Sequence, residues 1–261
     1  MKSKATAFTV VELLVAAAII VVLCVVAVPA VWGAYKSSSL AVSSNNIRQL
    51  AAGGAAYLAD NNYRFWAYRR KGEVGGTNGR VWWYGFEPSK SLVGTPEGQR
   101  TIDMDKGPLG PYVPRNIAPD PSFGFAGKPF KPKYKHGYIG IGYNVVLSST
   151  NNSIRDGWYS DGSEPRRYWD LKHPERTVVF ATAAQVNTFQ KPASLRNPMI
   201  EEFYGFDDDH TKIPSVHFRH NGHAMVAYAT GSAGLIKMDV ATKDRRVPDA
   251  NVGRLPPEVL R

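Results

Sequence analysis

The sequence holds a single cysteine, Cys24, so no disulfide can form within the chain. Any zinc site would have to rely on histidine and carboxylate ligands. Common catalytic signatures are also missing: there is no Gly-x-Ser-x-Gly elbow, no Gly-Lys-Thr phosphate loop and no His-Glu-x-x-His pair. Cys24 lies in an apolar run, where it is expected to pack as an inert side chain. The sequence therefore offers no nucleophile with its base, and we expect a protein that is not an enzyme.

Charge of either sign is sparse. The 261 residues include 32 Lys and Arg against 22 Asp and Glu, which gives a formal net charge of +10. Hydrophobic residues make up 43% of the chain, which excludes a disordered or collagen-like protein. The 24 Gly and 18 Pro predict many turns and short strands instead of a helix bundle. Basic clusters at 69–71, 128–135 and 166–167 would attract anionic polymers, but no nucleic-acid-binding motif accompanies them.

Nearly all the continuous hydrophobicity lies in the first 35 residues. Leu13 to Val28 is an unbroken apolar run, and its apolar flanks extend it to the roughly 20 residues that a membrane-spanning helix needs. An ordinary secretory signal peptide is the alternative, but its apolar core spans only about 7 to 15 residues. Lys2 and Lys4 precede the run and Lys36 follows it. The positive-inside rule therefore favours a cytoplasmic N-terminus with the rest of the chain outside.

Glu12 is the only charged side chain between Ala5 and Tyr35. A carboxylate in the middle of a membrane costs on the order of 2.5 to 3.5 kcal/mol, so a sequence that carries one is expected to supply a partner for it. The alternative is a simple anchor whose Glu12 reaches out to the membrane interface.

The segment Ala7-Phe8-Thr9-Val10-Val11-Glu12-Leu13-Leu14-Val15 resembles the class III leader of type IV prepilins and type II secretion pseudopilins. The resemblance implies that prepilin peptidase cuts between Ala7 and Phe8, that the new N-terminus is methylated, and that Glu12 pairs with the N-terminal amine of a neighbouring subunit. The family usually has Gly before the cut, so Ala7 is a departure. Pro29 falls where the family's first helix commonly bends, because proline removes a backbone hydrogen bond and clashes with the preceding turn.

Polar residues begin at Lys36, and small or apolar residues then recur at spacings of three and four, namely Val42, Ile47, Leu50, Ala51, Gly54, Tyr57 and Leu58. This pattern predicts one helix from about Thr9 to about Asp60, whose outer half packs on a globular head and which stops at Asn61-Asn62. The expected divisions are a leader at 1–7, a membrane or filament-core half-helix at 8–35, an amphipathic half-helix at 36–62 and a head at 63–261.

Within the head, the apolar and aromatic run Val81–Phe86 predicts a strand. Nine prolines between 87 and 136 predict a loop-rich insertion. Strands are expected again at 138–144 and 177–182. The three runs 216–219, 224–229 and 234–238, separated by turns, predict a β-meander.

The end of the chain carries a second resemblance. Many pseudopilin-like proteins have an Arg-His-x-Gly turn whose His is followed, after nine residues, by Asp-Gly. Here His220 and Gly222 form the turn, and Thr230-Gly231 stands where Asp-Gly is usual. The resemblance implies that His220 fixes its turn by bonding backbone groups and that Thr230 takes part of the role of the Asp. Weaker matches to the same group are Ser44–Leu50, Tyr143-Asn144 and Pro174–Thr182, whereas 63–136 resembles no family.

The histidines and acidic residues near the C-terminus raise the question of a metal site. Exposed or structural roles are favoured for His210, His217, His220 and His223, because His217 and His223, on a strand and turn, need not face the same point. Calcium is the one cofactor left open, since Asp207, Asp208 and Asp209 supply oxygen ligands and some pseudopilins use calcium to order a loop. Three adjacent carboxylates do not match an EF-hand and more often form a solvated turn. Asp156 and Asp161 are a second candidate of this kind.

The expected fold is α+β and pilin-like: a long N-terminal helix packed on an antiparallel sheet with a loop-rich insertion. The expected function is structural. The chain would enter the inner membrane with its head in the periplasm, be cut by prepilin peptidase, and join copies of itself or other pilin subunits in a type IV pilus or type II secretion filament, where its head is periplasmic or extracellular.

Two other functions remain open. In the first, the helix is only a tether and the head binds envelope polysaccharide or another anionic polymer through an aromatic platform, formed by Trp66, Trp82, Trp83, Tyr84, Trp158, Tyr159 and Trp169. In the second, the tethered head is a hydrolase, which would need a catalytic constellation within 63–136.

Overall fold

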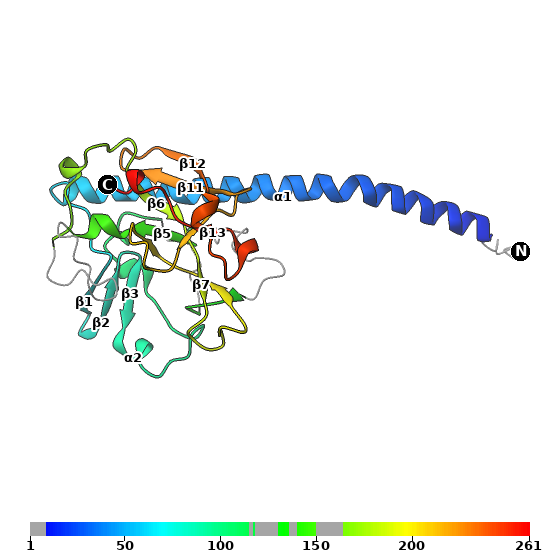
Figure 1. The fold of residues 1–261 in the computed structure, drawn as a ribbon. Coiled ribbons are helices and arrows are strands. Elements are labelled where there is room, and N and C mark those ends of the chain that lie inside the picture. Colours follow the sequence, from blue (N-terminus) through cyan, green and yellow to red (C-terminus); the bar gives the residue numbers. More distant parts are fainter. Residues whose placement is uncertain (1–8, 115–116, 118–129, 136–139, 150–163) are drawn as a thin grey trace, which may run out of the picture.

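The molecule consists of one long helix and a head that packs on the C-terminal half of that helix. The computed structural model describes residues 9–114, 117, 130–135, 140–149 and 164–261. Helix α1 spans Val10–Asp60, and Figure 1 shows that its N-terminal half projects from a head formed by the rest of the chain. Thr9 caps the start of α1, Asn61 caps its end, and Asn62 takes the left-handed conformation with φ of 52°. The predicted limits of this helix are confirmed.

Burial divides α1 into two halves. Every residue from Thr9 to Ser38 is exposed, and the buried face begins at Ser39. This face holds Ser39, Ser43, Asn46, Ile47, Leu50, Ala51, Gly53, Gly54 and Leu58. The apolar periodicity predicted the end of the face nearest Asp60, whereas the buried polar residues nearest the membrane half were missed.

A five-stranded sheet lies against the C-terminal half of α1, and its order is β12-β11-β6-β5-β9. Helix α1 contacts β11, β6 and β12 (Figure 1). All neighbours in this sheet are antiparallel except β5 and β9. The strands are β5 (Ile141–Asn144), β6 (Val178–Thr182), β9 (Gly205–Phe206), β11 (His223–Tyr228) and β12 (Ala233–Lys237).

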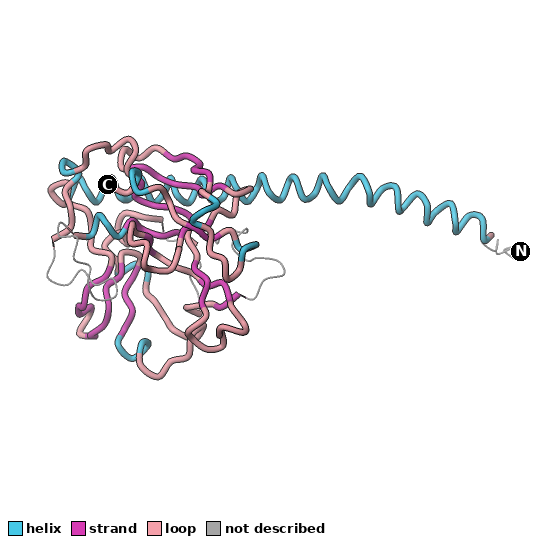
Figure 2. Tube along the Cα trace, in the orientation of Figure 1, coloured by secondary structure: helices cyan, strands magenta, loops and turns pink. Residues whose placement is uncertain are grey.

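Three smaller sheets complete the head, which is rich in loops (Figure 2). The first is the antiparallel sheet β1 (Arg69–Val74), β2 (Thr77–Trp82) and β3 (Gly85–Pro88). The second has the order β4 (Phe130–Lys131), β8 (Met199–Glu201) and β7 (Gln185–Asn187). The third pairs β10 (Val216–His217) with β13 (Val252–Gly253). The short helices are α2 (Ser89–Leu92), η1 (Met104–Lys106), η3 (Val145–Ser148), η4 (Tyr168–Asp170), η5 (Val240–Thr242), η6 (Pro248–Ala250) and η7 (Pro257–Val259).

The predicted single strand at Val81–Phe86 is wrong. Val81 pairs with Phe86 and Trp82 with Gly85, so Trp83 and Tyr84 form the tip of a hairpin between β2 and β3. Both tip side chains are buried in the core. A turn that points inward is built from apolar residues, which is why its sequence is indistinguishable from that of a strand.

The predicted three-stranded meander is also corrected. Strands β11 and β12 form the expected hairpin, but β10 pairs with β13, and the other neighbour of β11 is β6. The strand predicted at 177–182 is confirmed as β6. Of the strand predicted at 138–144, β5 is observed, while residues 138 and 139 lie outside the described part of the chain. The described residues of 87–136 form the end of β3, then α2, η1 and β4 between loops, as predicted.

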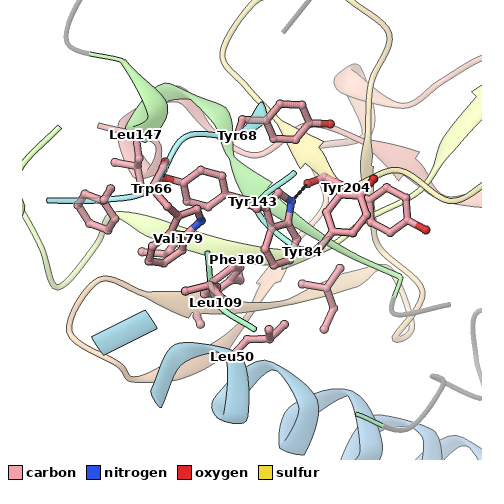
Figure 3. Close-up of a cluster of buried hydrophobic side chains, with 14 of the residues drawn as sticks. Leu50, Trp66, Tyr68, Tyr84, Leu109, Tyr143, Leu147, Val179, Phe180 and Tyr204 are labelled. Carbon is pink, nitrogen blue, oxygen red and sulfur yellow. Dashed lines mark hydrogen bonds between the residues drawn. The ribbon is translucent and has the colours of Figure 1, made fainter. Parts of the chain in front are cut away.

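Aromatic side chains fill the core between α1 and the sheets. The Trp66 ring stacks on Phe180 with centroids 5.7 Å apart, and Trp83 Nε1 donates a hydrogen bond to the Tyr204 carbonyl at 2.6 Å. Figure 3 shows Leu50 reaching from α1 toward this cluster. Burial of such large rings supplies most of the stabilisation available to a head with short strands.

Gly53 brings α1 close to the head. A Cβ at this position would lie 2.5 Å from Val113 Cγ2 and 2.9 Å from the Tyr112 carbonyl oxygen. We expect Gly53→Ala to destabilise the head by about 1 to 3 kcal/mol through overpacking, although alanine favours a helix by about 1 kcal/mol. Urea unfolding of the full chain in detergent, followed by tryptophan fluorescence, measures this change. Gly33→Ala is the matched control, since nothing lies within 4 Å of its Cβ position; equal stability of the two variants would contradict the prediction.

Candidate functional site

The N-terminal motif begins at the edge of the described chain. Ala7 and Phe8, the predicted cleavage residues, lie outside the described residues. Thr9 and Glu12 form a reciprocal capping box at the start of α1. Glu12 Oε2 accepts hydrogen bonds from the Thr9 backbone N–H at 2.9 Å and from Thr9 Oγ1 at 2.8 Å, and the Glu12 N–H donates to Thr9 Oγ1 at 3.2 Å. The Glu12 carboxylate therefore accepts hydrogen bonds from the residue that caps its own helix.

The rest of the apolar half is one continuous helix. Pro29 lies inside α1, and the N-terminal half of the helix curves gently (Figure 1). Within the described residues, α1 is the one helix long and apolar enough to cross a membrane. Trp32 and Tyr35 meet edge to face with ring centroids 6.3 Å apart, just before Lys36. Aromatic rings of this kind favour the boundary between a membrane and water.

His220 joins the head to α1. Its Nε2 lies 2.9 Å from Ser43 Oγ, and both residues are buried. The backbone groups of His220 and His223 bond each other at 3.0 and 3.1 Å, which closes the turn through Gly222. The backbone thus closes the turn, and the imidazole Nε2 reaches the helix. A bond from the His220 side chain to backbone groups of the turn stays a prediction.

Thr230 and Gly231 lie in the turn between β11 and β12, at the other end of β11 from His220. Thr230 is exposed, and its Oγ1 lies 3.0 Å from Ser232 Oγ. Gly231 has φ of 86°, a conformation that glycine adopts without strain. The two ends of the predicted signature are therefore separate turns. That Thr230 takes part of the role of the usual Asp stays a prediction.

The four histidines do not form a common site. His217 is buried, and its Nδ1 lies 3.4 Å from the Arg219 guanidinium. Burial, with a smaller contribution from Arg219, holds the pKa of His217 well below its usual range. His223 Nδ1 lies 3.0 Å from the Asn221 carbonyl oxygen, and His210 is exposed. In the described part of the chain, no group of three His, Cys, Asp or Glu residues is placed to hold a metal ion.

The three consecutive aspartates bond to cations and a threonine of this chain, and Lys212 lies within 4 Å of both Asp207 and Asp209. Asp207 pairs with Lys212 at 2.8 Å, Asp208 with Arg261 at 2.7 Å, and Asp209 accepts from Thr211 Oγ1 at 2.6 Å. Burial raises the pKa of Asp207, whereas the hydrogen bonds from Thr211 lower the pKa of Asp209. The Asp207 and Asp209 carboxylates thus bond within the segment 207–212, whereas Asp208 links this segment to Arg261. Asp156 and Asp161 lie outside the described residues.

Most of the predicted aromatic platform belongs to the core. Trp66, Trp82, Trp83 and Tyr84 are buried, so they are not available to stack on a ligand at the surface. Trp169 is 63% exposed and packs on Tyr63, with ring centroids 4.4 Å apart. Trp158 and Tyr159 lie outside the described residues.

A buried charged cluster was not predicted. Lys131 of β4 is fully enclosed, and its Nζ lies 2.6 Å from Glu201 Oε2 of β8. Asn187 Nδ2 donates to the same oxygen at 2.7 Å, Gln185 donates to Glu201 Oε1, and Glu97 also contacts Lys131. Burial alone would raise the pKa of Glu201, but Lys133 and Lys131 outweigh it and hold that pKa below its ordinary value. Lys131 and Glu201 are 70 positions apart, and each looks like a surface residue in the sequence.

The cluster lies under a hollow on the head surface. This hollow, which we call the head groove, has a volume of about 390 Å³. Strands β1 and β2, strands β7 and β8, and the segment 211–213 contribute to its walls. Its lining combines three cations, one carboxylate, two amides and four aromatic rings, given in chain order: Tyr68, Arg69, Trp82, Lys133, Gln185, Phe189, Gln190, Glu201, Phe203 and Lys212.

The contact between helix and head is tested by a double-mutant cycle on Ser43 and His220. We expect Ser43→Ala and His220→Ala each to cost about 0.5 to 1.5 kcal/mol of unfolding free energy, the net value of one hydrogen bond. The double variant should cost less than the sum of the two, since both remove the same bond. The cycle of Ser43→Ala with His223→Ala serves as the control and should be additive. Additive costs in both cycles would show that the His220 contact contributes nothing.

Glu202 should make stability depend on pH. Burial raises the pKa of Glu202 to about 8, and the Tyr204 hydroxyl and Lys133 oppose this only in part. The folded state therefore keeps a proton that the unfolded chain loses above its ordinary pKa of 4.5. The stabilisation is complete below that value and is lost as the pH rises through about 8, at about 1.4 kcal/mol per pH unit.

Glu202→Gln should remove this contribution, and urea unfolding across that pH range measures it. The exposed Glu258→Gln is the matched control and should keep the wild-type dependence. If the free energy of unfolding changed with pH in the same way for wild type and Glu202→Gln, the raised pKa of Glu202 would be contradicted.

The function has to be argued from the residues of this chain, because comparison with other proteins finds no match. No protein-family model, no curated protein and no solved structure matches it.

Proposed function

We propose that this chain is a pilin-like structural subunit that is anchored in a membrane by α1 and then assembled through that helix into a filament. The proposal rests chiefly on one observation: every residue from Thr9 to Ser38 is exposed, although the apolar run from Leu13 to Val28 lies within this stretch. Water cannot solvate so much apolar surface without a large free-energy cost. Lipid covers it first, and the helices of neighbouring subunits cover it in the filament.

The dimensions of the helix support a membrane stage. From Val10 to Trp32 the helix is about 34 Å long at 1.5 Å per residue, which matches the roughly 30 Å hydrocarbon core of a bilayer. Trp32 and Tyr35 then mark the boundary, and Lys36 begins the polar half. In this arrangement the head begins its contact with α1 at Ser39, directly outside the membrane.

Glu12 supports the filament stage. Both hydrogen bonds that its side chain accepts within the described residues go to Oε2, which leaves Oε1 with acceptor capacity. An apolar environment penalises that unused capacity, and an ammonium group is its best partner. The N-terminal amine of a neighbouring subunit, freed by cleavage before Phe8, would supply this partner and set the register between adjacent helices.

The role of Glu12 is tested by two variants. Glu12→Ala removes both the charge and the capping box, whereas Glu12→Gln keeps an oxygen that can complete the box and removes only the charge. We expect both variants to enter the membrane at wild-type levels and both to reduce filament incorporation by at least about tenfold, because each lacks the charged partner for the amine. Fractionation of sheared filaments and membranes, followed by immunodetection, measures the two quantities.

Wild-type incorporation of Glu12→Gln together with loss for Glu12→Ala would show that the carboxylate only caps its own helix. Intact mass measured on the same membranes tests the processing step. A mature chain that begins at a methylated Phe8 is expected, and an unprocessed chain that begins at Met1 would contradict the proposal.

A further inference from the structure

We propose that the head groove binds a carboxylate-bearing sugar unit of an acidic polysaccharide. The volume of about 390 Å³ falls within the range of small-ligand sites and suits one or two sugar rings. It is too small for a helix or a nucleic-acid duplex. This inference concerns the head alone and holds whether or not α1 assembles into a filament.

The charge of the groove selects an anion. Its lining carries the cations Arg69, Lys133 and Lys212 against the single carboxylate of Glu201. That carboxylate is already paired with Lys131 beneath the surface at 2.6 Å. Lys212 is held by Asp207 at 2.8 Å, whereas no described carboxylate lies within salt-bridge distance of Lys133. The groove thus has an excess of positive charge, centred on Lys133, for a ligand to neutralise.

Two of these cations rest on aromatic rings. The Arg69 guanidinium lies 4.8 Å from the centroid of the Trp82 ring, and Lys133 Nζ lies 5.6 Å from the centroid of the Phe203 ring. The negative face of a ring attracts a cation placed over it and so holds the cation in place. The rings therefore position the charge inside the groove.

The remaining lining suits the rest of a sugar. Phe189 is 59% exposed at the rim, so its face can pack on the apolar C–H face of a sugar ring. The Gln185 amide nitrogen donates to Glu201, and the Gln190 carbonyl oxygen accepts from Asn187 at 2.9 Å. The Gln185 oxygen and the Gln190 amide nitrogen remain for sugar hydroxyls. Apolar face, hydroxyl and carboxylate occur together in uronic acids. An isolated phosphate or sulfate would use only the cations.

The floor of the groove is built to stay rigid. Glu201 and Lys131 are fully buried, and Asn187 and Gln185 complete the hydrogen bonds of Glu201. Burying an ion pair gives little net stability compared with apolar packing, so its cost is better explained by the geometry it enforces. Here it holds β4, β7 and β8 in register and so preorganises the site.

The test is isothermal titration of the full chain in detergent micelles with tetragalacturonate. A neutral galactose tetramer and inorganic phosphate are the two comparison ligands. We expect tetragalacturonate to bind and its affinity to fall with added salt. Both comparison ligands should bind at least about tenfold more weakly, because the neutral tetramer lacks carboxylates and phosphate lacks the sugar ring and its hydroxyls. Equal binding of the neutral tetramer or of phosphate would overturn the assignment, as would no binding of tetragalacturonate at millimolar concentration.

Variants then locate the site. Lys133→Gln should weaken tetragalacturonate binding about tenfold, the effect of removing one hydrogen bond to a charged group. Phe189→Ala should weaken binding of the acidic tetramer as well, and its exposure makes misfolding a minor concern. Lys90→Gln, which removes an exposed lysine of α2 outside the groove, is the matched control and should bind like wild type. Unchanged binding in both groove variants, with tryptophan fluorescence confirming that they are folded, would place the ligand elsewhere.

Discussion

The main constraint on the whole structure is the exposed apolar surface of the N-terminal half of α1. Every residue from Thr9 to Ser38 is exposed, and the cost of leaving this apolar surface in water far exceeds the stability of a typical domain. One continuous helix must therefore serve two environments. Its apolar half is suited to lipid or to other helices, and its second half carries the head.

The junction between these halves explains the unusual buried face of α1. Next to the exposed half, Ser39, Ser43 and Asn46 are buried, and Ser43 bonds His220 of the head. Further along, Gly53 allows the Tyr112 backbone to approach the helix closely. The hydrogen bond between Ser43 and His220 has a preferred direction, and the close contact at Gly53 requires complementary surfaces. Together these two contacts define one orientation of the head on the helix.

The head gains its stability from large rings instead of long strands. Trp66, Trp83 and Phe180 bury their surfaces together, which compensates for sheets whose strands are two to six residues long. The same head encloses Lys131 and Glu201, which contribute little to stability. The aromatic core therefore stabilises the fold, whereas the buried ion pair lies beneath the head groove, which is the part of the head suited to a ligand.

The sequence by itself determined α1, its apolar half and its stop at Asn61-Asn62, because helix period, apolar length and capping are set by residues within a few positions of one another. Tertiary structure alone decided the inward turn at Trp83-Tyr84, the pairing of β10 with β13, and the contact of His220 with Ser43, 177 positions away. It also brought Lys131 to Glu201. Such contacts depend on the route of the whole chain, and the local pattern around each residue is the same whether or not its distant partner is present.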